Sequence, residues 1–571
     1  MASDKDDSAQ AKTSLESALD SGNNAGNIHA GTTKPFKPAD LQQLSPEEQH
    51  LWEEARVKEY TTLIENKTFI DERPIDDVRH YLRLGETLKL KRDGTRKSRM
   101  YVQGCCQVPG RDFDLSYSPT ISHMGFRLFL ALVMASCSYN GAADFISAYT
   151  QSILPVGERV WCRMVKKFRK YGSDGRELVH LLGRSLYGLV QSGRNWYLLL
   201  SGWLTKYGFI VAFSEPCLYM LYKGDSYMIL VTYVDDVPWG SNDMKLVAQV
   251  FADMERDGLK LTWDIGLTEV LGADLQHSAE GVTLHQSSYL RGLFDTHSQP
   301  IKSYEAELRD TVKTPCNGNL AKEVIEAAAA KEINKNGDVD LGKRFRTLVG
   351  ALLYAAIVSN PDIMYTVGQL CRVMAFPTEN LWQCAVHCLV YLKHRGAMGI
   401  MFYKSASASP ILSIFRHGNG MVRGLVDASW EVVRSTSGWM IFVNGCLVAW
   451  GSKKQSSIGL STNETEVMAA SMASQDIVKI RNAVDQLGWK QTRPSALLGD
   501  SKGAKALADN PIMKGLAKHI LRRELYVREQ TQAGVLRMYH VQTELNVSDM
   551  LTKALATNKF LKFRGLIMVR V

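Results

Sequence analysis

The sequence lacks several features that would assign it to common classes of protein. No apolar run approaches the roughly 18 residues that a membrane span needs, and the longest, residues 128–137, is about half that length. The ten cysteines have no regular spacing and form no Cys-x-x-Cys pair, which argues against a disulfide scaffold and a zinc ribbon. The first residues have neither the basic start nor the apolar stretch of a signal peptide. These absences predict a soluble, intracellular protein.

The composition that is present belongs to a chain of several globular domains. Of its 571 residues, 45% are hydrophobic and 22% are charged, and at about 100–200 residues per domain the chain should hold about three to five domains. The net charge of +9 favours an anionic partner such as nucleic acid.

Composition along the chain divides it into five segments. Residues 1–45 are polar and predict a disordered tail, and residues 46–300 predict a long folded region. Residues 301–344 are charged and rich in alanine, which indicates a linker, and residues 345–415 have the periodicity of broken helices. Residues 416–571 begin with short strands, and a long helix follows them.

Two local signals place elements in this last segment. Asn444-Gly445 lies between the apolar runs GWMIFV and CLVAW, which predicts a β-hairpin. Ser461 and Glu464 have the spacing of a capping box, which predicts that a helix begins at Thr462 and runs to about Leu487.

Adjacent aspartates occur at three places, and one of them has the setting of a metal site. The pairs at 6–7 and 76–77 fit a solvated surface, whereas Asp235-Asp236 directly follows the strand-like run YMILVTYV, where unpaired buried charge would be costly. Neighbouring strand residues face opposite ways, so two carboxylates converge on one ion only at a turn or a strand end. A third acid, Asp144, lies in the strand-like segment GAADFISAY. Three carboxylates around two divalent ions are the arrangement for in-line phosphoryl transfer.

The sequence around these acids resembles the reverse transcriptases of copia-like long-terminal-repeat retrotransposons. Residues 233–236, YVDD, match the YxDD box of that family. Seven further segments occur in the family's order: LWEEARVKEYTTLIENKTF, KSRMYVQG, SYSPT, DFISAY, SLYGLVQSGRNWY, VLGADL and LHQSSYL.

The resemblance implies which residues carry the chemistry. It gives the metal-binding role to the three acids Asp144, Asp235 and Asp236. Tyr149 would be the aromatic gate that collides with a ribose 2′-hydroxyl and so favours deoxynucleotides; the alternative is an aromatic packed in a core. Further contacts with the substrates are implied for Arg99 at the triphosphate, Gln191 beside the incoming nucleotide, and Leu271 and Gly272 at the primer grip.

A second ordered set of acids lies in the C-terminal segment. Asp427 is in a strand-like run, Glu466 is in the first turns of the predicted helix, Asp500 ends an apolar strand, and Asp549 is near the start of a last helix. Any one of them alone would most often be a surface or capping residue. Together they resemble, in order and element type, the four-carboxylate metal site of ribonuclease H. Four positions depart from the family's pattern without removing a ligand: Phe145, Pro238, Ser429 and Leu521.

The resemblance implies an α+β fold class: a right-hand polymerase with fingers, palm and thumb, then a connection segment and a ribonuclease H domain with a mixed sheet. The reverse transcriptase would span 46–300, the linker 301–344, the connection 345–415 and the nuclease 416–571. Two Mg²⁺ or Mn²⁺ ions would serve each site.

The implied activities are RNA-directed DNA polymerisation and ribonuclease H cleavage of an RNA·DNA hybrid. The implied partners are an RNA template, a DNA primer strand, the hybrid and deoxynucleoside triphosphates, together with a tRNA primer and the capsid protein of the element, and no membrane. The implied location is cytoplasmic, in a virus-like particle, or nuclear. The rival hypothesis is a catalytically inactive relic or a host-adopted nucleic-acid-binding protein; the presence of all seven predicted ligands favours the enzyme.

Overall fold

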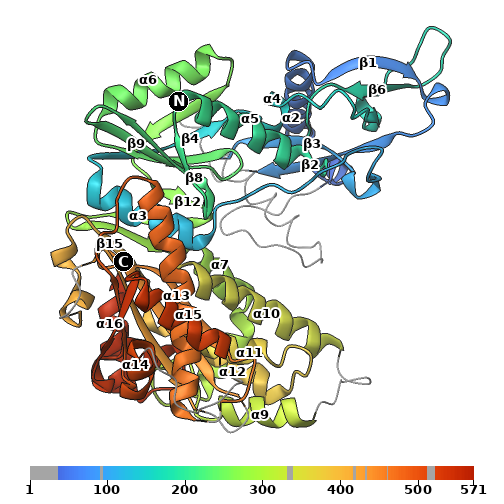
Figure 1. Cartoon of the computed structure of the whole chain (residues 1–571). Coiled ribbons are helices and arrows are strands. Elements are labelled where there is room, and N and C mark those ends of the chain that lie inside the picture. Colours follow the sequence, from blue (N-terminus) through green and yellow to red (C-terminus); the bar gives the residue numbers. More distant parts are fainter. Residues whose placement is uncertain are drawn as a thin grey trace, which may run out of the picture.

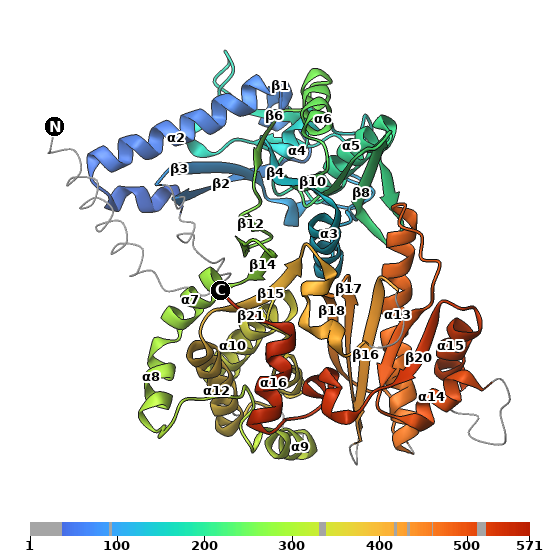
Figure 2. The same cartoon turned by 90° about the vertical axis from the view of Figure 1, so that its left-hand side faces the viewer.

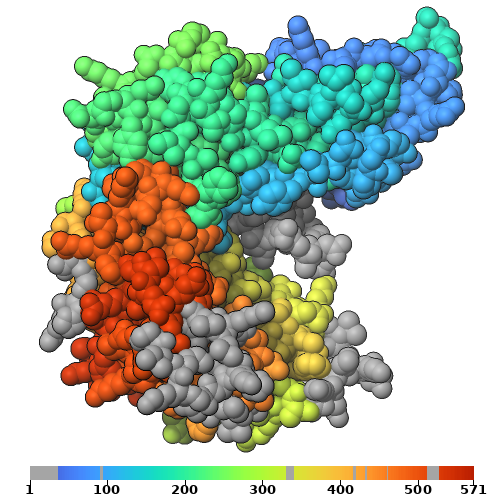
Figure 3. Space-filling model, viewed as in Figure 1, coloured from blue at the N-terminus to red at the C-terminus, as the bar shows by residue number. Residues whose placement is uncertain are grey.

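The computed structural model describes residues 37–90, 94–330, 339–415, 420–430, 434–459, 461–510 and 521–571. These residues form two lobes that lie one above the other (Figure 1). The upper lobe projects beyond the lower one on one side (Figure 3). The predicted tail falls almost wholly within residues 1–36, outside the described residues.

The projecting half of the upper lobe is a five-stranded sheet covered by one long helix. Helix α2 (Pro46–Glu65) begins at Ser45, whose side chain accepts a hydrogen bond from the backbone N–H of Glu48, and packs against β3. Its buried Arg56 pairs with Glu86 of β2 at 2.9 Å. In sheet order the strands are β1 (Phe69–Pro74), β6 (Leu178–Leu182), β5 (Trp161–Arg163), β2 (Leu82–Leu90) and β3 (Arg96–Val102).

The other half of the upper lobe is a six-stranded antiparallel sheet with helices on both faces. Its strands, in sheet order, are β11 (Leu261–Ile265), β4 (Tyr139–Phe145), β10 (Asp236–Ser241), β9 (Ser226–Val231), β8 (Glu215–Lys223) and β7 (Ile210–Ala212). Helices α5 (Ser192–Tyr207) and α6 (Met244–Arg256) share one apolar core with the sheet, and the short α4 (Ala148–Gln151) follows β4.

Helix α3 (His123–Ser136) lies between the two lobes (Figure 2). It packs on β8, β9 and β10 above and on β15 (Met398–Tyr403), β17 (Thr436–Val443) and β18 (Cys446–Lys454) below. Contacts on both sides explain why this segment carries the longest apolar run of the sequence. No helix among the described residues is both long enough and apolar enough to cross a membrane.

Buried polar contacts lock the lobes together. The guanidinium of Arg127, in α3, donates to the carbonyl oxygens of Val448 at 2.8 Å and Ile357 at 2.7 Å, and it stacks 3.9 Å above the ring of Trp450. The Tyr222 hydroxyl of β8 also donates to the carbonyl of Leu487, which directly follows helix α13 (Thr462–Gln486), at 2.7 Å. The lower lobe is therefore docked directly on α3 and on the six-stranded sheet.

A third sheet joins segments that the sequence assigns to three different domains. Its order is β12 (Glu269–Val270), β13 (Ala273–His277), β14 (Gly281–His285), β15 (Met398–Tyr403) and β21 (Val569–Arg570). Six helices accompany it: α7 (Ser287–Thr296), α8 (Ser298–Ala306), α9 (Leu320–Ala330), α10 (Val339–Val358), α11 (Met364–Cys371) and α12 (Glu379–Arg395). The predicted boundaries at 300 and 415 therefore do not separate independent units.

The prediction that 301–344 is only a linker is wrong for its described part. Helix α9 packs against α11 and α12, and its Leu320 and Val324 are 0% and 1% exposed. Alanine and charge dominated the composition, but the few apolar residues recur at helical spacing and are buried. Residues 331–338 of this segment lie outside the described residues.

The lower lobe also contains a five-stranded mixed sheet, in the order β18 (Cys446–Lys454), β17 (Thr436–Val443), β16 (Val422–Ser429), β19 (Ser495–Gly499) and β20 (Leu536–His540). The first three strands are antiparallel and the last two run parallel to β16. The helices are α13 (Thr462–Gln486), α14 (Lys502–Asp509), α15 (Leu521–Gln532) and α16 (Thr557–Ile567).

The two local signals of this lobe are confirmed. Asn444 and Gly445 form the predicted turn with φ of 49° and 79°, and Ser461 caps α13 by accepting from the Glu464 N–H. The predicted α+β fold class is likewise confirmed.

Candidate active sites

A two-residue turn between β9 and β10 presents Asp235. Tyr233 and Asp236 exchange backbone hydrogen bonds of 2.9 and 3.0 Å, so Val234 and Asp235 form the turn. Val234 has φ of 55°, a left-handed conformation that costs a β-branched residue about 1–2 kcal/mol. Two contacts hold the strained turn: the indole N–H of Trp196 donates to the Val234 carbonyl at 2.5 Å, and the Phe145 N–H donates to the Asp235 carbonyl at 3.0 Å.

The three predicted acids of the upper lobe lie together at this turn. Asp144 of β4 is directly opposite Asp236 of β10 in the antiparallel pair, so both side chains leave the same face of the sheet. Loss of water around the Asp236 carboxyl, together with the charges of Asp235, Asp144 and Glu269, raises its pKa to about 6. A group of carboxylates that resist joint ionisation is suited to a cation.

Two departures from the family pattern have visible effects on this sheet. The ring of Phe145 packs edge-on against Trp196 at 5.0 Å between centroids and so supports the donor to the turn. Pro238 has no N–H to donate, and the regular pairing of β10 with β9 begins only at Trp239. Neither change displaces a carboxylate.

Two residues with predicted substrate contacts lie beside this cluster. The guanidinium of Arg99, from β3, is 3.9 Å above the Tyr187 ring, and the Tyr149 ring meets Tyr187 edge-on at 4.8 Å. Burial and the nearby charge of Asp235 raise the pKa of Tyr149. A cation from the five-stranded sheet and an aromatic ring that follows β4 thus lie near the turn that carries Asp235.

Gln191, which is predicted to lie beside the incoming nucleotide, is held by hydrogen bonds inside the protein. It is fully buried, and its amide donates to the Asp112 carbonyl and the Glu158 carboxylate and accepts from Gln107, all at 2.9–3.0 Å. Both amide hydrogens of Gln191 are thus donated to protein acceptors, and the side chain ties the segment before α5 to Gln107, Asp112 and Glu158.

Leu271 and Gly272 form the turn that joins β12 to β13, with φ of 54° and 71°. The Tyr354 hydroxyl donates to the Leu271 carbonyl at 3.2 Å. Glu269, which precedes the turn, is close enough to raise the pKa of Asp236. The strand that leads into the predicted primer grip is therefore within electrostatic reach of the carboxylates.

The second cluster lies at one end of the mixed sheet of the lower lobe. Asp427 comes from β16, Glu466 from α13, and Asp500 directly follows β19; each offers an oxygen within 4.8 Å of the other two. Asp427 is 2% exposed and Glu466 is 9% exposed. Burial, reinforced by neighbouring carboxylates, raises the pKa of Asp427 to about 7 and that of Glu466 to about 9.

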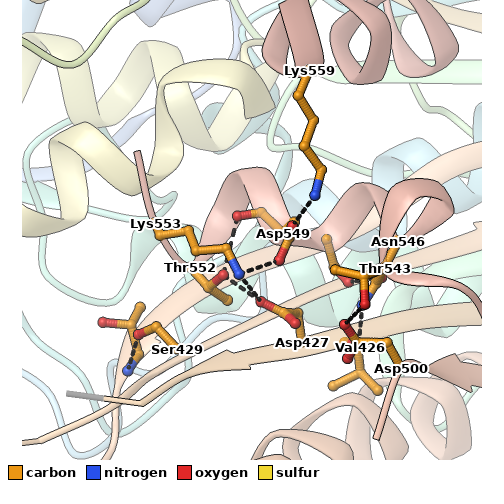
Figure 4. A network of polar contacts seen from close by, with 12 residues as sticks. Val426, Asp427, Ser429, Asp500, Thr543, Asn546, Asp549, Thr552, Lys553 and Lys559 are labelled. Carbon is orange, nitrogen blue, oxygen red and sulfur yellow. Dashed lines mark hydrogen bonds and ion pairs between the residues drawn. The ribbon is translucent and has the colours of Figure 1, made fainter. Parts of the chain in front are cut away.

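The fourth predicted acid, Asp549, is paired with lysines. It lies in the 3-10 helix η9 (Val547–Leu551), whereas the last helix, α16, begins only at Thr557. Its carboxylate lies 2.6 Å from Nζ of Lys553 and 2.7 Å from Nζ of Lys559 (Figure 4). Burial raises the pKa of Asp549, but the two ammonium groups outweigh it and lower the pKa overall.

Lys553 also links the fourth acid to the other three. Its Nζ is 4.0 Å from Oδ2 of Asp427, and the Thr552 hydroxyl donates to the same oxygen at 2.5 Å. Sequence reasoning missed Lys553, Lys559 and Thr552. The spacing of Asp549 and Lys553, four residues apart, was the available signal.

Comparisons with known proteins give matches over most of the chain. Residues 67–299 match the family model described as reverse transcriptase (RNA-dependent DNA polymerase). This part of the chain is therefore similar to reverse transcriptase domains. A retrovirus-related Pol polyprotein from transposon TNT 1-94 of Nicotiana tabacum is 27% identical over 482 residues, which are 83% of this chain and 34% of that protein.

More distant matches extend over most of the chain. The transposon Ty1-BR Gag-Pol polyprotein of Saccharomyces cerevisiae is 23% identical and matches 93% of this chain and 29% of its own length. The foamy viral protease-reverse transcriptase, solved in complex with an RNA/DNA hybrid, covers 94% of this chain and 61% of its own, at 12% identity and a TM-score of 0.44. The chain spans about a third of the length of the curated relatives. The predicted resemblance to copia-like retrotransposon Pol proteins is confirmed.

Proposed function

We propose that the protein is an RNA-directed DNA polymerase that also cleaves the RNA strand of an RNA·DNA hybrid. The observation that carries the proposal is the pair of separate carboxylate clusters, each on the elements that its chemistry needs. The acids of the upper lobe meet at a turn beside Arg99 and Tyr149, and those of the lower lobe gather at the end of a mixed sheet.

The donor atoms of both clusters fit Mg²⁺ or Mn²⁺. Carboxylate oxygens are the ligands that these hard cations prefer. Burial, and after it the charge of neighbouring carboxylates, raises the pKa values of Asp236, Asp427 and Glu466, and a bound cation would favour their ionised forms. Two ions in each cluster would activate the attacking oxygen and stabilise the leaving oxygen.

The side chains of the upper lobe would bind and orient the polymerisation substrates. Arg99 would pair with triphosphate oxygens of a deoxynucleotide, because a guanidinium suits such acceptors. Tyr149 would stack beneath the sugar and exclude a 2′-hydroxyl. The turn at Leu271 and Gly272 would hold the primer end near Asp235.

The side chains of the lower lobe would position the scissile strand of a hybrid. Asp427, Glu466 and Asp500 would hold the cations, and Lys553 would keep Asp549 and Asp427 at their separation. The preference of this site for an RNA·DNA hybrid over duplex DNA would depend on the 2′-hydroxyls of the RNA strand. From the resemblance we also propose priming by a tRNA, association with the element's capsid protein, and a location in cytoplasmic virus-like particles or the nucleus.

A crossed pair of variants tests the proposal. Asp235→Asn should lower primer extension on an RNA template by about a thousandfold, since removing a ligand charge costs several kcal/mol of transition-state stabilisation, and it should leave hybrid cleavage intact. Asp500→Asn should do the reverse. Each variant is thus the folding control for the other.

The outcome that would overturn the proposal is equally definite. A wild-type protein that binds the hybrid but neither extends a primer nor cleaves RNA with Mg²⁺ or Mn²⁺ is a relic or a host-adopted binding protein. A single variant that removes both activities would show that the clusters do not act separately.

A further inference from the structure

Two adjacent thiols stand apart from the other cysteines of the protein. Of the ten cysteines, only Cys105 and Cys106 are exposed; the other eight are buried or half-buried. Both lie in one turn of 3-10 helix, η3 (Gly104–Cys106), and their sulfur atoms are 3.9 Å apart. The pair is therefore open to solvent and arranged so that both sulfurs can reach one ligand.

The distance between the sulfurs decides which chemistry suits them. A disulfide needs sulfurs about 2.05 Å apart and Cα atoms usually about 4.4–6.8 Å apart, whereas adjacent residues across a trans peptide are held at about 3.8 Å. Direct oxidation of the pair would thus distort the backbone. Two thiolates about 2.3 Å from one tetrahedral ion, in contrast, lie about 3.8 Å from each other. The observed separation matches chelation.

We propose that Cys105 and Cys106 form a binding site for a single thiophilic centre, either a soft divalent cation such as Cd²⁺ or Zn²⁺ or trivalent arsenic. With an aryl arsenoxide, two As–S bonds form, the As=O bond breaks, and the oxygen leaves as water with the two thiol protons. With Cd²⁺, two thiols lose their protons as two Cd–S bonds form.

The turn that carries the dithiol is tied to the segment before α5. Gly104 packs so closely on Gly188 that a Cβ on Gly104 would lie 1.9 Å from the Gly188 carbonyl oxygen. Gln107, the first residue after η3, accepts from the Val190 N–H at 2.8 Å and donates to Gln191 at 3.0 Å. A ligand that moves this turn therefore moves residues 188–191.

The same segment supports the substrate side of the site. Tyr187, whose backbone carbonyl accepts from the Val102 N–H at 2.7 Å, is the ring that contacts both Arg99 and Tyr149. Attachment of a bulky group such as the aryl ring of an arsenoxide, which crowds this turn, should therefore slow primer extension and leave hybrid cleavage unchanged. This consequence, unlike the binding itself, rests on the proposed function.

Binding is tested on the full-length protein with phenylarsine oxide and with Cd²⁺, in separate arms, by intact-mass spectrometry under native conditions. The wild type should take up one equivalent of either probe. The variants Cys105→Ser and Cys106→Ser should each bind about 100-fold more weakly or worse, because a chelate loses its effective concentration when one ligand is removed. Cys137→Ser and Cys371→Ser, at half-buried cysteines, should bind like the wild type.

The site would be overturned by an adduct that persists in the Cys105→Ser/Cys106→Ser variant, or by single variants that bind as tightly as the wild type. It would also be overturned if glutathione disulfide oxidised the pair to a disulfide, seen as a loss of two mass units, and the protein formed no adduct with either probe. The link to polymerisation is tested by the rate of extension of each protein with and without phenylarsine oxide, and by recovery with 2,3-dimercaptopropanol. A wild-type arsenical adduct with an unchanged extension rate would overturn that link. Because the adduct is weighed directly, a protein that never extends a primer would contradict the proposed function and leave the binding result standing.

Discussion

The two acidic clusters are positioned by different forces. In the upper lobe Asp235 lies on a strained backbone turn, and among the residues that the structure describes no lysine or arginine forms an ion pair with Asp235 or Asp236. In the lower lobe Asp427 and Asp549 are 2% and 0% exposed, and two lysines contact Asp549 directly.

This difference predicts which substitution should disturb each cluster most. The upper-lobe acids Asp144, Asp235 and Asp236, which we propose form the polymerase cluster, are held by hydrogen bonds to the backbone of the turn. This cluster should therefore be sensitive to the loss of a neutral donor. The lower-lobe acids, which we propose form the nuclease cluster, are Asp427, Glu466, Asp500 and Asp549. They are held by burial and by opposite charge, so this cluster should be sensitive to the loss of a cation. Each prediction below changes one of these supports.

The largest effect is expected for Trp196→Phe. This change keeps an aromatic ring against Phe145 but removes the donor to the Val234 carbonyl, which is worth about 1 kcal/mol. The strained turn should then relax and displace Asp235, and a displacement of about 1 Å can cost about 100-fold in rate. Steady-state kinetics should show kcat for primer extension lowered by about 10- to 100-fold, with hybrid cleavage unchanged.

Trp203→Phe is the matched control, because Trp203 is on the same helix and its indole donates to Asp257, away from the turn. It should extend primers like the wild type. If Trp196→Phe also does so, the indole does not hold the turn in its active conformation.

The sequence predicted those parts of the clusters that depend on local pattern. Asp235 follows an apolar strand and Asp500 ends one, while the capping box at Ser461 places Glu466 in the first turns of a helix, so all three could be assigned from their flanks. The environment of Asp549 depends on a 3-10 turn that brings Lys553 back toward β16, which no local pattern shows. Gln191 was assigned a substrate contact by resemblance, and its amide hydrogens are donated to distant residues such as Asp112 and Glu158.

The same limit applies to the fold. Helix α9 was taken for a linker because its burial of Leu320 and Val324 depends on packing against α11 and α12. The sheet that joins β14, β15 and β21 pairs strands more than a hundred residues apart, and such pairing leaves no mark on the composition of any one segment.

For the nuclease cluster we expect Lys553→Met to lower the free energy of unfolding by about 1–2 kcal/mol in the absence of metal. The change removes one of the two cations that balance buried Asp549, and hydrogen bonds to charged groups contribute about 1.5–3 kcal/mol. Added Mn²⁺ should restore more stability to the variant than it adds to the wild type, because a divalent ion can replace the missing charge. Urea denaturation with and without Mn²⁺ measures both effects.

The control is Lys562→Met, which removes an exposed ammonium bound to the Glu544 carbonyl and should leave stability unchanged. Equal stability of Lys553→Met and the wild type in a metal chelator would show that Lys553 does not balance the cluster.

A smaller effect is expected from pH on metal-induced stabilisation. The pKa values of Asp427 and Glu466, about 7 and about 9 in the folded protein, exceed the value of about 4 for unfolded carboxyls. Between these limits the folded state binds more protons than the unfolded state, so this contribution to stability falls as pH rises. Mn²⁺ must displace those protons, and its stabilising effect should therefore grow as pH rises.

The two clusters should differ in this respect, because the pKa of Asp236 is only about 6. From about pH 7 to about pH 8.5, the rise in melting temperature caused by Mn²⁺ should increase by about 2–4 °C. Asp500→Asn should abolish this increase and Asp235→Asn should retain it. An increase that survives Asp500→Asn would place the proton competition outside the nuclease cluster.

The smallest effect is expected for Val234→Gly. Glycine adopts the φ of 55° found at this position without the cost of about 1–2 kcal/mol that valine bears, but it loses about 0.5–1 kcal/mol of chain entropy on folding. The free energy of unfolding should therefore rise by about 0.5 kcal/mol. Asn444→Gly is the comparison in the lower lobe: asparagine tolerates its φ of 49°, so no strain is released and stability should not increase. If Val234→Gly instead destabilises the protein by more than about 1 kcal/mol, packing of the valine side chain, and not the backbone contacts of Trp196 and Phe145, fixes the position of Asp235.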